Sequence, residues 1–446
     1  RRSCGPDIKL RGPSFLHWLK ANLPDDMVAC LTINEKYRDG LGFKTKQRES
    51  AGKPARAALF AAMEDRTDCG DIREALHAFE EANSTASGKF KAMLKVSDED
   101  CVRHQFMFNG ASQTGRFAAQ GIQLHNTRRD VPKDAVHMIE RIKTCPPAVL
   151  EAEFGSINTA LARLVRPALM AEDGLSLVWS DWSAIEARMI PWLSGDPRAE
   201  RVLDIFRSGG DIYITEAQGI FGQTDIDKEQ RQIGKVATLA LGFGGGVGAF
   251  QAMAKGYGVA VTDARADEIK NAWRKNNPWA TTFWRACETA AMNAIRRPLE
   301  PQTAGRITYV FVPDLLRGSL LAYMPSGRFL CYPQASIQQV AKFDQPDDTL
   351  VFRHPTYGMS TTWGGTLAQG VTQGEAASLL RQKIRECDLE IVLTVHDEIV
   401  IETDDPARDG AKLVNMMCHV PDWAQGLPLD ADAEYGTRYK VGQPLE

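Results

Sequence analysis

The chain has 446 residues, of which 43% are hydrophobic and 25% are charged, and its formal net charge is −4. This length is too great for one ordinary hydrophobic core, so two or three subdomains around a common cleft are expected. No apolar stretch is long enough to cross a bilayer, which argues against a membrane role, and the slightly acidic total means that any phosphate binding must come from local basic patches.

Nine cysteines are scattered without the spacing of metal ligands. They fit reduced thiols in a cytoplasm better than a disulfide framework or a zinc site. Candidate basic patches are residues 36–56, with seven Lys or Arg residues, Arg128 and Arg129 with Lys133, and Arg296 with Arg297. Each patch taken alone is more often a solvated face than a binding site.

The first hundred or so residues predict a mainly helical region, with helices over 54–63 and 72–83 and without an alternating strand pattern. The pattern changes near Phe106. Residues 175–182 (LSLVWSDW) then predict a short buried strand that ends in an acidic residue. A helix is expected over 184–193, with Gly195 and Pro197 as stop signals.

Further along, residues 224–227 (TDID) predict the acidic start of a long helix that runs through Arg231 and Lys235 and ends in the glycines of 242–248. Residues 366–385 are helical in pattern. Residues 390–402 (EIVLTVHDEIVIE) contain two apolar runs that flank a polar tip, which predicts a β-hairpin.

Two aspartates have the position that metal-assisted phosphoryl transfer needs. That chemistry uses carboxylates to hold paired Mg²⁺ ions and cations to bind a triphosphate. Asp181 stands at a strand end and Asp397 at a hairpin tip, where a β-sheet meets solvent, and they lie 216 residues apart (397 − 181). An isolated Asp at a strand end is more often a turn former or a cap, so the fold has to bring the two together.

A cationic stripe is expected on the predicted long helix. Arg231 and Lys235 are four residues apart, so they share a helix face, and Leu239 continues the stripe one turn later. Two such cations can bind a polyphosphate, although a solvated amphipathic face has the same pattern. The glycine-rich run GFGGGVG follows a helix instead of opening one after a strand, which excludes a phosphate-binding loop of the nucleotide-fold type.

Five segments in order resemble the motifs of family A (DNA polymerase I-like) DNA polymerases. DWSAIEAR from Asp181 resembles motif A, RQIGKVATLALGFGGG from Arg231 resembles motif B, and VHDE from Val395 resembles motif C. TGRFAAQGIQLHN, which ends at Asn126, resembles the upstream Thr-Gly-Arg block, and TQGEAASLL resembles the Gln-bearing helix before motif C. One motif would be weak evidence, whereas five in order are specific, and the likeness extends from about Ser84 to the C-terminus.

Finer features are similar to the bacteriophage and prophage branch of this family. They are RPALMAEDG, TTWGGTLAQGVTQ and PDWAQGLPLDADAEYGTRYK. The sequence departs from the usual family pattern at Leu239, where many members have Phe or Tyr, and at Trp182 and Ala184, which replace Tyr and Gln. These departures concern discrimination among sugars and analogues more than metal binding.

The resemblance implies an α+β, right-hand polymerase fold with palm, fingers and thumb subdomains. We expect a mainly helical thumb over 1–105, the first part of the palm over 106–195, the fingers over 196–355 and the second part of the palm over 356–446. It also implies template-directed addition of dNTPs to a primer 3′-hydroxyl, with release of pyrophosphate.

By the same resemblance, Asp181 and Asp397 are the catalytic ligands of two Mg²⁺ ions, for which Mn²⁺ can substitute. The backbone carbonyl of Trp182 completes the ligand set. Glu398 is either an accessory metal ligand or simply a hairpin residue.

The resemblance assigns the nucleotide site to residues of motifs A and B. Arg231 is expected at the outer phosphates, Lys235 at the triphosphate and as proton donor to pyrophosphate, and Phe243 beside the nascent base pair. Glu186 is expected to exclude a 2′-hydroxyl, and Leu239 to line the site. The expected contacts to DNA are Arg116, Asn126, Gln369, Gln373 and His396.

Primer-template DNA and dNTPs are the expected partners, accessory replication proteins are left open, and the setting is a bacterial or phage-infected cytoplasm. Because few residues precede Ser84, we expect no proofreading by this chain. One alternative is a single-subunit RNA polymerase, against which Glu186 and the HDE triplet argue. Another is a non-catalytic DNA-binding replication protein. In such a protein, Asp181, Asp397 or Lys235 would be expected to be replaced, and all three are present.

Overall fold

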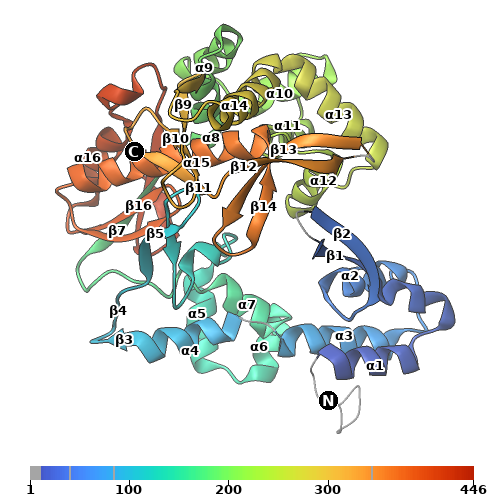
Figure 1. The fold of residues 1–446 in the computed structure, drawn as a ribbon. Helices are drawn as coiled ribbons and strands as arrows, with labels where there is room; N and C mark the ends of the chain where they lie inside the picture. Colours follow the sequence, from blue (N-terminus) through green and yellow to red (C-terminus); the bar gives the residue numbers. More distant parts are fainter. Residues whose placement is uncertain (1–11, 40–41, 84–85, 343–344, 446) are drawn as a thin grey trace. The chain divides into compact units, whose positions relative to one another are not determined.

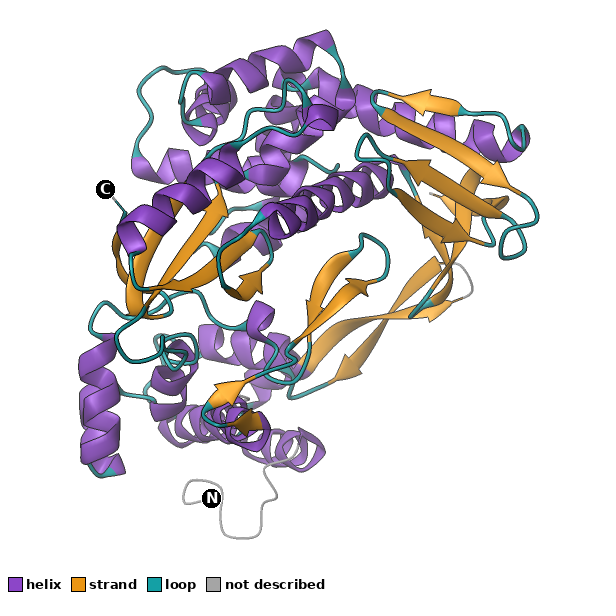
Figure 2. Ribbon diagram, turned by 90° about the vertical axis from the view of Figure 1, so that its left-hand side faces the viewer, coloured by secondary structure: helices purple, strands orange, loops and turns teal. Residues whose placement is uncertain are grey.

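A computed structural model describes residues 12–39, 42–83, 86–342 and 345–445 (Figure 1). The chain divides into two compact units, one formed by Arg1–Arg103 with Thr127–Ala168 and the other by His104–Asn126 with Leu169–Glu446. Both contain helices and antiparallel strands, so the α+β class is as predicted (Figure 2). The segment 127–168, which the sequence analysis assigned to the palm, packs with the first unit.

The first unit is mainly helical. Its core contains Phe15 and Phe79, whose rings stack with centroids 4.1 Å apart. The predicted helices over 54–63 and 72–83 are confirmed as α2 and α3. Its elements are α1 (Gly12–Asn22), η1 (Asp25–Leu31), β1 (Thr32–Asp39), β2 (Gly42–Glu49), α2 (Lys53–Ala62), α3 (Gly70–Ala82), α4 (Ala86–Val96), β3 (Ser97–Asp98), β4 (Cys101–Val102), α5 (Ala135–Thr144), α6 (Pro147–Phe154) and α7 (Ile157–Arg163).

This mainly helical region also contains a hairpin that the sequence did not predict. Strands β1 and β2 pair antiparallel, from Thr32 opposite Glu49 to Asp39 opposite Gly42. Their sequences, TINEKYRD and GFKTKQRE, are mostly polar. Because no apolar residue recurs at every second position, periodicity gives no signal for this hairpin.

The second unit holds the predicted motifs. Its helices are η2 (Leu124–Asn126), α8 (Ile185–Ser194), η3 (Pro197–Ala199), α9 (Glu200–Arg207), α10 (Ile212–Phe221), α11 (Lys228–Leu241), α12 (Val247–Gly256), α13 (Asp263–Asn276), α14 (Pro278–Arg296), α15 (Gly364–Glu386), α16 (Pro406–Cys418) and η4 (Asp422–Ala424). Its strands are β5 (Phe106–Ala111), β6 (Arg116–Ala119), β7 (Ser176–Trp182), β8 (Gln302–Ala304), β9 (Ile307–Val312), β10 (Ser319–Tyr323), β11 (Phe329–Pro333), β12 (Ser336–Lys342), β13 (Gln345–His354), β14 (Gly358–Thr362), β15 (Ile391–Val395), β16 (Glu398–Thr403), β17 (Ala431–Arg438) and β18 (Val441–Pro444).

One five-stranded antiparallel sheet, in the order β15-β16-β7-β17-β18, organises this unit. The predicted strand over 175–182 is its central strand β7, and the predicted hairpin over 390–402 is β15 and β16. Ser180 and Trp182 are buried, whereas Asp181 between them is exposed. Consecutive residues from Leu177 to Ser180 are buried, so both faces of β7 are covered there, and Asp181 is exposed near the end of the strand.

Local signals explain where the site helices begin and end. The helix after β7 is entered through Ala184 in a left-handed conformation (φ 52°) and ends at Gly195 (φ 59°). Helix α11 begins with a capping box in which the Asp227 side chain accepts from the Gln230 backbone and the Gln230 side chain accepts in return. Both helices, and α15 over the predicted 366–385, agree with the sequence expectation.

Within the described ranges, no helix combines the length and the apolar character that a membrane crossing requires. The eight cysteines that these ranges include are all unpaired, and Cys4 lies outside them.

Candidate active site

The two predicted metal-binding aspartates converge at one end of the five-stranded sheet. Asp181 on β7 lies opposite Glu398 of β16 and Asp432 of β17 in the strand register. Asp397 occupies the turn just before Glu398. Burial and the negative charge of Asp181 raise the pKa of Asp397 to about 6. The two carboxylates are therefore near enough to repel each other.

Glu398 is already engaged by the protein. Its two carboxylate oxygens accept hydrogen bonds from the Tyr439 hydroxyl and the Lys440 ammonium. Burial raises the pKa of Glu398, and the charge of Lys440 opposes that shift. Glu398 was expected to be either an accessory metal ligand or a hairpin residue. This geometry gives it structural partners in the connection between β17 and β18.

Asp181 and Asp397 fit divalent cations even though the described residues contain no cluster of three or more His, Cys, Asp or Glu side chains that could hold a metal. Mg²⁺ prefers oxygen ligands and is commonly bound through one or two carboxylates together with substrate phosphates. The mutual repulsion that raises the pKa of Asp397 is the interaction that a bound cation would offset.

A polar cluster joins motif A to the upstream and downstream blocks. Arg116 Nη2 donates to Glu186 Oε1 over 2.7 Å, and Gln373 Nε2 donates to the same oxygen over 3.1 Å. The charge of Arg116 also lowers the pKa of Asp397, against the effect of burial. Four predicted site residues from separate segments therefore lie close together: Arg116, Glu186, Gln373 and Asp397.

The remaining predicted DNA contacts lie around this cluster. His396 Nε2 is 3.1 Å from the His125 carbonyl oxygen, and the two rings are 4.9 Å apart. Gln369 and Gln373 line a cavity with an empty volume of about 390 Å³. The Asn126 side-chain amide donates to Gln123 Oε1 over 3.2 Å.

The cationic stripe of α11 is formed as predicted. Arg231 Nε donates to Asp211 Oδ2 over 2.7 Å, while Asp211 also caps the start of α10. The Lys235 ammonium lies 5.7 Å from the ring centroid of Tyr213 and 5.2 Å from that of Tyr257. Within the described part of the chain it forms no ion pair, so its charge is available to an anion.

Gly234 lets α11 approach α10 closely. A Cβ atom at this position would lie 2.1 Å from the Tyr213 carbonyl oxygen, which is backbone and cannot move aside. Gly234 lies between Arg231 and Lys235 in sequence. The packing of the two helices therefore fixes where both cations lie relative to α10.

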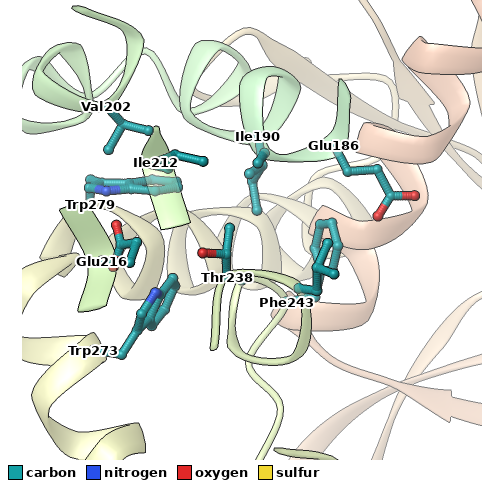
Figure 3. A pocket seen from close by; sticks show the side chains of 12 residues that line it. Glu186, Ile190, Val202, Ile212, Glu216, Thr238, Phe243, Trp273 and Trp279 are labelled. Carbon is teal, nitrogen blue, oxygen red and sulfur yellow. The ribbon is translucent and has the colours of Figure 1, made fainter. Parts of the chain in front are cut away.

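Three predicted nucleotide-site residues, Glu186, Leu239 and Phe243, line one pocket with an empty volume of about 440 Å³. Figure 3 shows Glu186 and Phe243 on one side of it and Glu216, Trp273 and Trp279 on the other. The pocket runs between α8 and α11, the helices that carry motifs A and B.

The inner end of the pocket contains a buried acid. Glu216 Oε2 accepts from Asn277 Nδ2 over 2.7 Å, and Asn277 Oδ1 accepts from Trp279 Nε1 over 3.0 Å. Burial raises the pKa of Glu216 to about 7. The folded protein therefore keeps this carboxyl neutral to a higher pH than an ordinary glutamate.

Sequence reasoning missed several residues of the site. Asp211, Tyr213 and Tyr257 contact predicted residues without standing in a motif, and Tyr439 and Lys440 end the segment PDWAQGLPLDADAEYGTRYK, which gave them no role. Only Asp211 had a local signal, as an acidic residue before the helical run IYITEAQGIF. Of the proposed basic patches, Arg128 and Arg296 are paired with Asp130 and Asp348, and the side chains of residues 36–45 lie outside the described ones.

Comparisons with known proteins point to one protein family. The sequence model of DNA polymerase family A matches residues 29–299, more than half of the chain. The DNA polymerase of Bacillus phage SP02 is 31% identical over 388 residues, which are 84% of this chain and 58% of the phage protein. The thermostable DNA polymerase I of Thermus filiformis is 24% identical over 292 residues, 63% of this chain and 29% of that protein. The chain thus spans less than two thirds of the length of these relatives.

A solved structure shares the fold. The POL domain of Pol1 from M. smegmatis, in complex with a DNA primer-template and dNTP, matches 99% of this chain and 63% of that chain, with a TM-score of 0.59 and 17% sequence identity. This likeness confirms the predicted right-hand polymerase fold class, while the bounds of palm, fingers and thumb remain predictions. From the family match and the phage relative, the chain belongs to DNA polymerase family A.

Proposed function

We propose that this chain catalyses template-directed DNA synthesis, in which the primer 3′-hydroxyl attacks the α-phosphorus of a dNTP and pyrophosphate leaves. The observation that carries the proposal is the convergence of Asp181 and Asp397 beside the ion pair of Arg116 and Glu186. Family membership supports the same reaction, since the relatives are DNA polymerases.

Asp181 and Asp397 are proposed to hold two Mg²⁺ ions, with the Trp182 carbonyl as a further ligand and Mn²⁺ as a substitute. When bound, such ions lower the pKa of the primer hydroxyl and neutralise triphosphate charge. The protein contributes two carboxylates at the end of a rigid sheet, which fixes where the reacting groups meet.

The motif B helix is proposed to bind the triphosphate. Lys235 lacks an acidic partner within the described residues, so it can stabilise the departing pyrophosphate and donate a proton to it. Arg231 would break its hydrogen bond to Asp211 and bind the outer phosphates of the nucleotide. Phe243 and Leu239 would border the base and sugar at the mouth of the pocket.

Glu186 is proposed to exclude ribonucleotides, because its carboxylate is held at the pocket mouth by Arg116 and Gln373. Arg116 and Gln373 would contact the primer terminus in the minor groove, where all base pairs present acceptors. His396 is proposed to support the primer from the hairpin tip, and Asn126 and Gln369 are the weaker contacts of this set.

Primer extension on a defined template tests the proposal. The chain should extend a 5′-labelled primer in the presence of dNTPs and Mg²⁺, with incorporation that follows the template. Extension with rNTPs alone would indicate an RNA polymerase, and DNA binding without extension would indicate a non-catalytic protein. A bacterial or phage-infected cytoplasm is the proposed setting, and accessory replication proteins are candidate further partners.

A further inference from the structure

Two arginines from distant segments hold the turn that precedes Arg116. Arg381 of α15 donates through Nη2 to the Asn109 side-chain oxygen over 2.8 Å and to the Gly115 carbonyl. Arg328, just before β11, reaches the Thr114 carbonyl with its Nη2 at 3.4 Å. The turn between β5 and β6 is therefore held by two guanidiniums.

Arg328 is itself fixed to α15. Its Nη1 donates to the Gly374 carbonyl over 3.1 Å and to Ser378 Oγ over 2.9 Å. Gly374 follows Gln373, the residue that bonds Glu186. One guanidinium thus connects the helix that presents Gln373 with the turn that presents Arg116.

The two guanidiniums lie close enough for their charges to oppose each other. Burial and the neighbouring charge of Arg328 lower the pKa of Arg381 to about 10. Two like charges close together are unfavourable unless hydrogen bonds compensate them. Here the acceptors are groups of the turn, and Arg381 also lies 4.6 Å from the ring centroid of Phe108 on β5.

The turn leaves no space for a side chain at Gly115 while its two polar neighbours stay in place. Gly115 has φ of 71°, and a Cβ atom there would lie 2.2 Å from Arg328 Nη2 and 2.6 Å from Asn109 Oδ1. The next residue is Arg116, whose guanidinium reaches Glu186. Because the chain is fixed one residue before Arg116, the anchors determine where that side chain starts.

We propose that Arg328 and Arg381 are positioning residues for Arg116: by hydrogen bonding to the β5–β6 turn, they keep the Arg116 guanidinium at Glu186 and at the primer terminus. The inference rests on the proposed function of Arg116 as a primer contact. Neither anchor is a catalytic residue, since both act through the turn.

A double-mutant cycle tests the proposal. The full chain is prepared as wild type, Arg381→Gln, Arg116→Ala and the double variant, and steady-state primer extension is measured with a matched primer terminus. Arg381→Gln should lower kcat about tenfold with a smaller change in KM, because misplacement of a contacting group impairs the reacting geometry more than affinity. In the Arg116→Ala background the same substitution should cost less than twofold.

Controls separate positioning from general damage. Arg385→Gln, on an exposed part of the same helix, should leave extension unchanged. Arg381→Lys keeps the charge but loses the planar two-sided donor, so it should resemble Arg381→Gln and not wild type. Hydrogen exchange at the amides of Gly115 and Arg116 should become faster in both Arg381 variants, a readout that does not depend on activity.

Equal tenfold losses in both backgrounds, or an unchanged kcat and unchanged exchange for Arg381→Gln, would overturn the positioning role. If Arg116→Ala alone extends primers like wild type, the proposed function of Arg116 fails, and the inference fails with it. That result is distinguishable because it appears in the single variant. Should Arg381→Gln not fold, Arg328→Lys provides the same cycle from the other anchor.

Discussion

Arg116 and Glu186 form an ion pair across 2.7 Å, and Gln373 donates to the same carboxylate oxygen. Both charged side chains are more than a quarter exposed, at 28% and 27%. Exposed pairs contribute little to stability. The pair matters instead because it joins a residue proposed to exclude the 2′-hydroxyl with one proposed to contact the primer.

Two substitutions of Glu186 test separately whether the size or the charge of its side chain excludes ribonucleotides. Glu186→Ala should increase ribonucleotide acceptance relative to deoxyribonucleotides by at least tenfold, because the space it occupied becomes free. Glu186→Gln keeps the volume and should keep most of the discrimination. The measurement is the ratio of kcat/KM for a dNTP and its matching rNTP. A ratio that stays the same in the Ala variant would refute the exclusion role and reopen the RNA polymerase alternative.

The two aspartates should be required for chemistry more than for affinity. Asp181→Asn or Asp397→Asn should lower single-turnover incorporation by several orders of magnitude, because the cation ligands are lost. Primer-template binding, followed by fluorescence anisotropy, should stay near wild type. Asp404→Asn, an exposed change just beyond the far end of β16, serves as the matched control. Substantial extension by either site variant would remove that residue from the catalytic role.

The two cations of α11 should differ in the step that they affect. Lys235→Ala should slow the chemical step more than it weakens nucleotide binding, since the ammonium is proposed to lie near the leaving oxygen. Arg231→Ala should weaken both. Single-turnover rates over a series of dNTP concentrations separate the two effects, with exposed Lys228→Ala as control. Purely affinity-based losses of equal size in both variants would argue against proton donation by Lys235.

Glu216 should make stability depend on pH near neutrality. Its folded-state pKa of about 7 exceeds the ordinary value of 4.5, so the folded protein binds this proton more tightly than the unfolded chain does. Stability is therefore lost as pH rises from about 4.5 through about 7. Glu216→Gln should remove this loss. The free energy of unfolding of the variant minus that of wild type should therefore rise by roughly 2 to 3 kcal/mol between pH 4.5 and pH 8.

Urea unfolding of both proteins at several pH values checks this expectation. The comparison cancels the titration of the other groups, and Arg201, whose charge favours the ionised form of Glu216, is present in both proteins. A difference between variant and wild type that is constant with pH would show that Glu216 does not titrate in this range.

Gly234 should not tolerate a side chain. Gly234→Ala places a methyl group against the Tyr213 backbone, so α11 must shift away from α10, at a cost of about 1 to 3 kcal/mol. Gly248→Ala in α12 is the control, because a Cβ atom there meets nothing within 4 Å. Thermal unfolding should show a lower midpoint for the first variant alone, and equal midpoints would contradict the close packing.

The elements that carry the motifs could be predicted because their signals are local. The apolar run before Asp181 predicts a strand, Asp227 and Gln230 supply both halves of a capping box, and the polar tip at His396 interrupts two apolar runs. Each signal depends on only a few neighbouring residues, so it can be recognised without knowledge of the fold.

The contacts between segments could not be predicted in the same way. Lys440 meets Glu398 across the sheet, and Arg381 meets Gly115 from a residue 266 positions away. No local pattern encodes such partners. The β1–β2 hairpin was missed for the opposite reason, since its residues are local but too polar for periodicity to reveal.

The close approach at Gly234 has a consequence for movement. With α11 seated directly on the backbone of α10, rotation of α11 about its own axis would turn a larger side chain into the Tyr213 carbonyl. The two helices are therefore expected to travel as one rigid body. Asp211 caps α10 and bonds Arg231 of α11, so it would travel with them. Arg231 must then leave Asp211 for a nucleotide by turning its own side chain, and a displacement of the helix cannot make that exchange for it.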